Sequence, residues 1–143
     1  MAFTIQNPPE FTLEVEQWTR ETDADGAQMA SNVIEPLLNN EVYLKTELER
    51  QERVALVTLT AAGWGGSAAP YTQTVQVNGA REGMEPVMVS ALADGATLEA
   101  QKAYIKAFGI LCGGTGILGE GTATFGVYKK PVVDITVGLR GVM

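Results

Sequence analysis

Residues 54–79, VALVTLTAAGWGGSAAPYTQTVQVNG, contain two runs in which apolar and polar side chains alternate. Between these runs lies a loop-like stretch that is rich in alanine and glycine and ends in proline. A period of two together with many β-branched residues is typical of half-buried strands, and glycine and proline mark the connection between them. We therefore predict two strands, at 54–60 and 71–77, joined by a loop.

The remainder of the chain after this stretch continues the β pattern, with one exception. Residues 94–108 combine a candidate cap, Asp94, with apolar positions at helical spacing, which predicts a helix. Further strands are predicted at 86–91, 110–112, 122–128 and 132–139. Short strands separated by turn residues indicate an antiparallel β-sandwich or small barrel with one helical insert.

Charge and glycine content both change near residue 53. Residues 1–53 hold 11 acidic and 4 basic side chains and so carry the whole net charge of −7, whereas 15 of the 16 glycines follow residue 53. Glycine punctuates turns, while Glu, Leu, Gln and Arg favour helices. The sequence predicts two domains, a helical segment at 1–53 and a β domain at 54–143. The predicted fold class is therefore mainly β with a helical N-terminal segment, in which a short helical stalk precedes the β domain.

The N-terminal part begins with a candidate attachment segment. Phe11, Leu13 and Val15 alternate with polar residues, which predicts a half-buried strand. Two prolines directly before it disfavour a central position in a sheet. We expect this strand and its acidic surroundings to dock on another protein.

The helical segment at 27–53 carries an apolar stripe. Pro36 predicts an interruption, with a second helix that has this proline in its first turn. The stripe consists of Ile34, Leu37, Leu38, Leu44 and Leu48, and Glu41 lies within it. An isolated helix of this length is marginal in water, so its apolar face must pack on the β domain or on copies of itself. The charge-rich end of the helix, with one narrow apolar side, favours self-association as a short trimeric or dimeric stalk. We expect a trimer, although a stripe this short with Glu41 inside it has no clear a/d preference and does not separate the two states.

Composition excludes several classes of site. With no histidine and one cysteine, the chain has no disulfide framework, zinc finger, histidine-based triad or Cys–His dyad, and Cys112 is expected to be a buried, inert thiol. The net negative charge argues against nucleic-acid binding. No apolar run approaches the length of a membrane span, and nothing marks secretion. No metal or cofactor is expected.

Two motifs suggest enzyme chemistry, and neither is accepted. Residues 114–119, GTGILG, match a dinucleotide fingerprint with Asp134 about 20 residues further on. The residues that follow are strand-like, however, and this site needs a helix there, so a β-turn loop is predicted. The few carboxylates of the β domain lie mostly in predicted loops, which argues against an acid–base pair. We therefore expect no enzymatic activity.

Trp64 and Tyr71 leave two interpretations open. A tryptophan flanked by small residues in a loop can be a platform on which a sugar ring stacks. Alternatively, both rings close one end of the sandwich or lie between subunits, which is the interpretation we favour.

The order of residues 57–79, followed by Pro86-Val87-Met88-Val89, resembles the C-terminal β domain of tail-fibre, head-fibre or baseplate appendage proteins from phages and prophages of gut Firmicutes. Such domains run from a strand through a GWSGS loop and a PYTQTV-like strand to a V-x-G turn, a P-x-V strand, a helix near a tyrosine, and closing strands. The resemblance covers about residues 54–143. Residues 25–45 are similar to the helical lead-in that joins a virion-attachment segment to this domain.

The resemblance implies a non-enzymatic structural protein of the virion, made in the cytoplasm of the bacterial host. Because the chain has no extended shaft, a small fibre, collar or connector is expected. Its partners would be copies of itself and other virion proteins. The alternative is a glycan-binding adhesion module that recognises a bacterial surface carbohydrate through Trp64 and Tyr71. The members of this family share no catalytic residues, so the resemblance implies no catalytic residue in this chain.

Overall fold

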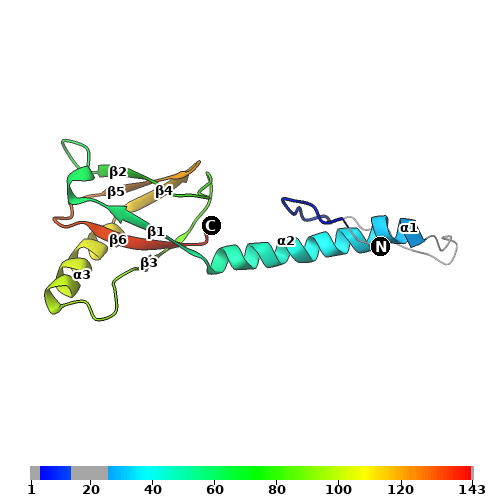
Figure 1. The fold of residues 1–143 in the computed structure, drawn as a ribbon. Helices are drawn as coiled ribbons and strands as arrows, with labels where there is room; N and C mark the ends of the chain where they lie inside the picture. Colours follow the sequence, from blue (N-terminus) through cyan, green and yellow to red (C-terminus); the bar gives the residue numbers. More distant parts are fainter. Residues whose placement is uncertain (1–3, 14–25, 143) are drawn as a thin grey trace. The chain divides into compact units, whose positions relative to one another are not determined.

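The computed structural model describes residues 4–13 and 26–142 and divides the chain into two compact units, Met1–Glu49 and Arg50–Met143 (Figure 1). The boundary between the units lies four residues before the change in composition at residue 53. Each unit is described separately below.

A nearly continuous helical run dominates the first unit. It comprises α1 (Gly26–Met29), a π-helical turn (Ala30–Ile34) and α2 (Glu35–Glu52). In the wide turn the Glu35 N–H donates to the Ala30 carbonyl, five residues back. Pro36 follows at the second position of α2. In the first turn of a helix its missing N–H costs no helical hydrogen bond, but its ring would crowd the preceding turn. The predicted interruption at Pro36 therefore takes the form of a widened turn, and the helix continues through it.

The second unit is an antiparallel β-sandwich with one helical insert, the first of the two architectures that the sequence predicts. One sheet has the strand order β1-β6-β3 and the other has the order β2-β5-β4, and all four strand pairs are antiparallel (Figure 1). The insert is α3 (Leu98–Cys112). The strands are β1 (Val54–Leu59), β2 (Tyr71–Gln76), β3 (Val87–Ser90), β4 (Thr115–Gly119), β5 (Thr122–Val127) and β6 (Ile135–Arg140).

One hydrophobic core joins both sheets and α3. Along β1 every second residue is buried, and its inward side chains lie opposite those of β6, with Val57 beside Val137 and Leu59 beside Ile135. From the helix, Ala107 and Leu111 enter the same cluster. The alternation of apolar residues therefore selects the face of each strand that is buried.

Three predictions around α3 are wrong. Residues 110–112 form the last turn of this helix and not a strand, because a short apolar run fits either a strand or a buried helical face. The helix is capped by Thr97, whose Oγ1 accepts from the Ala100 N–H at 3.2 Å, and not by Asp94. Cys112 is exposed and not buried, since the helical path turns it away from Leu111 and the core.

Residues 115–119 of the glycine-rich motif form strand β4 and not a turn, and Gly114 directly precedes this strand. A side chain on Gly114 would collide with the Gly126 carbonyl oxygen, so this glycine permits close approach to β5. The turn follows at Gly121, which has a φ of 66°. Gly114 therefore permits close packing of two segments, whereas Gly121 permits a turn. The local sequence does not distinguish these two roles of glycine.

The predicted attachment strand is not present over the part of it that the structure describes. Residues 4–13 contain no strand, and Val15 lies outside the described residues. Within the described ranges, no helix is sufficiently long and apolar to cross a bilayer.

Candidate self-association surface

Side-chain amides of α2 hold the N-terminal segment, residues 4–13, along one face of the helix. Asn39 Oδ1 accepts from the Gln6 N–H at 3.0 Å. Asn40 makes two bonds to Thr12, since its Oδ1 accepts from the Thr12 N–H at 2.7 Å and its Nδ2 donates to the Thr12 carbonyl at 2.8 Å. These amides pair with backbone groups of an irregular segment that bends at Asn7 and Pro8 and belongs to no sheet.

Two further contacts extend this attachment in both directions along α2. Near the start of the helix, Glu35 Oε1 accepts from the Thr4 N–H at 3.0 Å. Further along, the rings of Phe11 and Tyr43 lie 5.7 Å apart, tilted by 54°. Phe11 therefore packs partly within its own unit but is still 45 % exposed, and Leu13 of the attachment segment is 89 % exposed.

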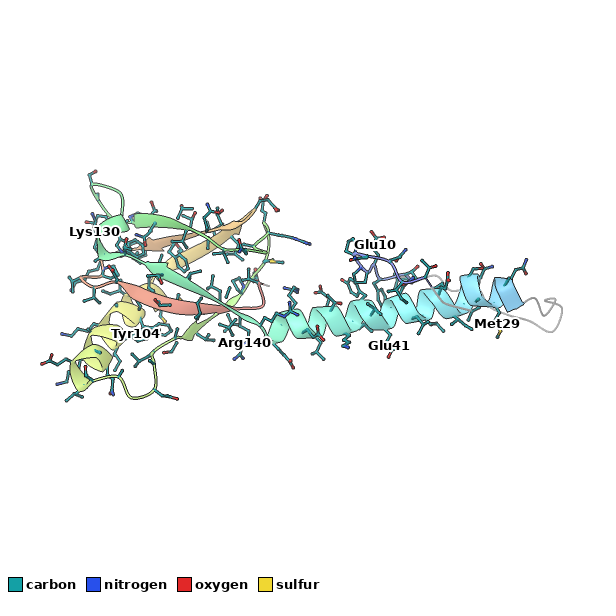
Figure 2. All side chains as sticks on the ribbon, in the orientation of Figure 1. Glu10, Met29, Glu41, Tyr104, Lys130 and Arg140 are labelled. Atoms are coloured by element: carbon teal, nitrogen blue, oxygen red, sulfur yellow. The ribbon has the colours of Figure 1, made fainter. Side chains whose placement is uncertain are left out.

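The apolar stripe lies on a different face of the same helix. Leu37, Leu44 and Leu48 are 52 %, 57 % and 60 % exposed, while Ile34 and Leu38 are half-buried. Because a helix turns by about 100° per residue, these leucines lie on the side facing away from Asn39. Figure 2 shows Glu41 on that side, away from the segment that carries Glu10. The helix thus has one face covered by its own chain and one apolar face open.

The open face has the spacing of a short coiled-coil seam. Leu48 falls at an a position of a heptad, as does Ile34 at the end of the preceding π-helical turn, and Leu37 and Leu44 fall at d positions. Glu41 occupies the a position between them, where a polar residue fixes register at a cost in stability. Identical helices can bury this seam against one another.

The structure does not bring Trp64 and Tyr71 together as an exposed pair. Trp64 follows a 3₁₀ turn (Ala61–Gly63) and is 5 % exposed, with its ring in the core, which agrees with a role in closing the sandwich. Its Nε1 is buried without a hydrogen-bond partner. Tyr71 opens β2 and is half-buried, with Lys130 Nζ 4.6 Å from its ring centroid.

Sequence reasoning missed the structural role of Gln73. This side chain is buried on the inward side of β2, where its Oε1 accepts from the Thr60 N–H at 3.0 Å and its Nε2 donates to the Thr60 carbonyl at 3.1 Å. Thr60 directly follows β1, so one amide links the two sheets. The period-two pattern, which places Gln73 on the same side as Val75 and Val77, was the available signal.

Tyr104 has a similar role between α3 and the β1-β6-β3 sheet. Its hydroxyl accepts from the Ala91 N–H at 2.9 Å and donates to the Thr136 carbonyl at 2.9 Å. Its ring stacks on Phe108 at a centroid distance of 5.7 Å. Figure 2 labels Tyr104 on the inner side of the helix.

The residues of the apparent dinucleotide fingerprint have structural roles. Asp134 Oδ1 accepts from the Ala61 N–H at 2.7 Å and so holds the start of the 3₁₀ turn. Residues 114–119 lead into a hairpin, so they offer no helix N-terminus to a pyrophosphate. Over residues 4–13 and 26–142, no group of three or more His, Cys, Asp or Glu side chains could hold a metal ion.

Comparison of the chain with known protein families, with curated proteins and with solved structures found no match.

Proposed function

We propose that this chain is a non-enzymatic structural protein whose copies associate through α2, as a trimer, within a small appendage of a phage particle. One observation carries the self-association. The N-terminal segment occupies the polar face of α2, while Leu37, Leu44 and Leu48 remain exposed on the apolar face.

A second copy is the occupant that best fits this face. Each chain supplies the same stripe at coiled-coil spacing, so identical helices are complementary to one another. Burial of apolar surface stabilises the assembly by about 25 cal/mol per Å². Leu38 at an e position widens the stripe beyond a strict a/d seam, and a wider face is the kind buried in bundles of more than two helices.

The placement in a phage appendage rests on the sequence resemblance of residues 54–143. In its support, the elements from β1 to β6 follow the order that the resemblance implies. The V-x-G stretch is a turn, in which the Ala80 N–H donates to the Val77 carbonyl at 3.1 Å and Gly79 has a φ of 82°. Leu13 of the attachment segment is the exposed residue we assign to docking on another virion protein.

The alternative, a glycan-binding module, has less support. A stacking platform needs an open aromatic face, and the ring of Trp64 is buried in the core. The Tyr71 ring is half-buried and is contacted by Lys130.

Sedimentation equilibrium of the purified chain at micromolar concentration tests self-association. We expect a mass about three times the 15.2 kDa of one chain. Leu44→Glu places a charge in the seam and should give monomers, because the carboxylate would be desolvated in the assembly. The control Thr46→Glu adds the same charge to an exposed site off the stripe and should leave the trimer intact. A monomeric wild-type chain, or equal dissociation of both variants, would contradict the proposal.

A further inference from the structure

A cleft of about 720 Å³ lies between α3 and residues 129–133 of the second unit. Lys102 and Lys106, one helical turn apart on α3, line one side of this lysine cleft, and Lys129 and Lys130 line the other. Figure 2 labels Lys130 at the end of the sandwich distant from Arg140. These four lysines are four of the six basic residues that follow residue 53.

The charge of the lysine cleft is opposite to that of the whole chain. Glu99 is the one acidic residue of its lining, so the local balance is 4 − 1 = +3, against −7 for the protein. Among the described residues, Lys130 has the Tyr71 ring as its partner, and the other three ammonium groups form no ion pair. Four like charges with one counter-charge among them repel one another, so an anionic occupant would be stabilised here.

The surface between the lysines is aliphatic. It is formed by Ala103, Ala107, Ile110, Val132 and Val133. Val132 is 86 % exposed, so its burial by a partner would remove apolar area from water. The occupant must therefore combine negative charge with aliphatic groups.

We propose that the lysine cleft binds an acidic peptide segment of a partner protein, one in which carboxylates alternate with aliphatic side chains. In an extended peptide, successive side chains point to opposite sides, so one set can contact Val132 and Ile110 while carboxylates reach lysines on both sides of the cleft. The site lies wholly within the second unit and does not depend on self-association through α2.

Other anions fit the lining less well. A fatty acid has one carboxylate and would leave three of the four lysines without a counter-charge. The lining offers an acidic polysaccharide no aromatic ring on which a sugar could stack. Glu99 is the one carboxylate of the lining that could accept hydrogen bonds from sugar hydroxyls. A nucleic acid presents phosphates but no aliphatic groups for the floor, and the net charge of the chain repels it.

Fluorescence anisotropy with the full-length chain tests this proposal. The probe is a labelled octapeptide of alternating glutamate and leucine, and its partner probe replaces each leucine with serine. We expect saturable binding of the first peptide, weakening with added salt, and at least about tenfold weaker binding of the second. Dodecanoate and an oligogalacturonate serve as unlabelled competitors and should displace the peptide poorly.

Two matched pairs of variants locate the binding. Lys106→Glu should weaken peptide affinity about tenfold, while Arg81→Glu, the same reversal at an exposed position outside the cleft, should not. Val132→Thr should weaken it about threefold, while Val87→Thr should not. All four positions are exposed, so the fold is retained, as circular dichroism would verify.

Four outcomes would overturn the proposal. The first two are no saturable binding of the glutamate–leucine peptide and equal affinity for the glutamate–serine peptide. The third is displacement of the labelled peptide by dodecanoate or oligogalacturonate at a lower concentration than by unlabelled peptide. The fourth is an equal loss of peptide affinity in Lys106→Glu and Arg81→Glu.

Discussion

At the scale of single residues, the glycines of the second unit differ in what they permit. A Cβ on Gly114 would overlap the carbonyl oxygen of Gly126 on the neighbouring strand, and backbone cannot move away as a flexible side chain can. Gly109, in contrast, lies inside α3 with no atom within 4 Å of where its Cβ would be. The two positions therefore form a natural pair for testing how the β4–β5 hairpin is packed.

We expect Gly114→Ala and Gly109→Ala to change stability in opposite directions. Gly109→Ala should raise the free energy of unfolding by about 0.5–1 kcal/mol, because alanine loses less conformational freedom than glycine in a helix. Gly114→Ala should lower it by about 1–3 kcal/mol, because strand β4 must shift to avoid the clash. Urea unfolding followed by circular dichroism measures both. Equal stability of the two variants would show that β4 does not approach β5 as described.

At the scale of elements, α2 has two different faces. Asn39 and Asn40 bind backbone of the N-terminal segment on one face, and leucines at a and d positions remain open on the other. Glu41 is the residue that interrupts the apolar seam. In an assembly its carboxylate would be brought among those of the other copies and partly desolvated, which weakens association.

We expect Glu41→Leu to strengthen self-association. Removing a carboxylate from the seam and adding apolar area should lower the apparent dissociation constant about tenfold or more. Thr46→Leu, which adds the same side chain to an exposed site off the stripe, is the control for general effects on helix propensity and hydrophobicity. Analytical ultracentrifugation over a range of concentrations measures both. An unchanged constant for Glu41→Leu would place Glu41 outside the interface.

At the scale of the whole molecule, the two units obtain their stability differently. The second unit has a core shared by two sheets and α3, whereas the described part of the first is a helix with one irregular segment attached to it. A helix of 18 residues with an open apolar face gains much of its stability from packing. Self-association through that face should therefore link the melting of α2 to protein concentration.

We expect thermal unfolding followed at 222 nm to have a concentration-dependent part. The loss of helical signal from α2 should move to higher temperature as the protein concentration rises about twentyfold, because assembly stabilises the folded helix by mass action. The transition of the second unit should stay at the same temperature. In Leu44→Glu neither transition should depend on concentration. A wild-type melting curve that is independent of concentration would contradict assembly through α2.

The sequence by itself determined an antiparallel β domain, its helical insert and the helical N-terminal segment, and it left a sandwich and a small barrel as the two possible architectures. Alternation located β1, β2, β3, β5 and β6 to within a few residues. The stripe on α2 was visible as helical spacing of leucines. These features follow from neighbours along the chain, because burial of one face imposes its own period on the residues of a strand or helix.

Only the tertiary structure decided features that depend on distant parts of the chain. Residues 110–112 are helical because that path brings Leu111 into the core, and residues 115–119 form a strand because β5 pairs with them. The attachment of residues 4–13 needs amides that lie about 30 positions later. The lysine cleft joins residues of α3 to residues 129–133. The local periodicity of the sequence does not predict such contacts, because packing between distant segments creates them.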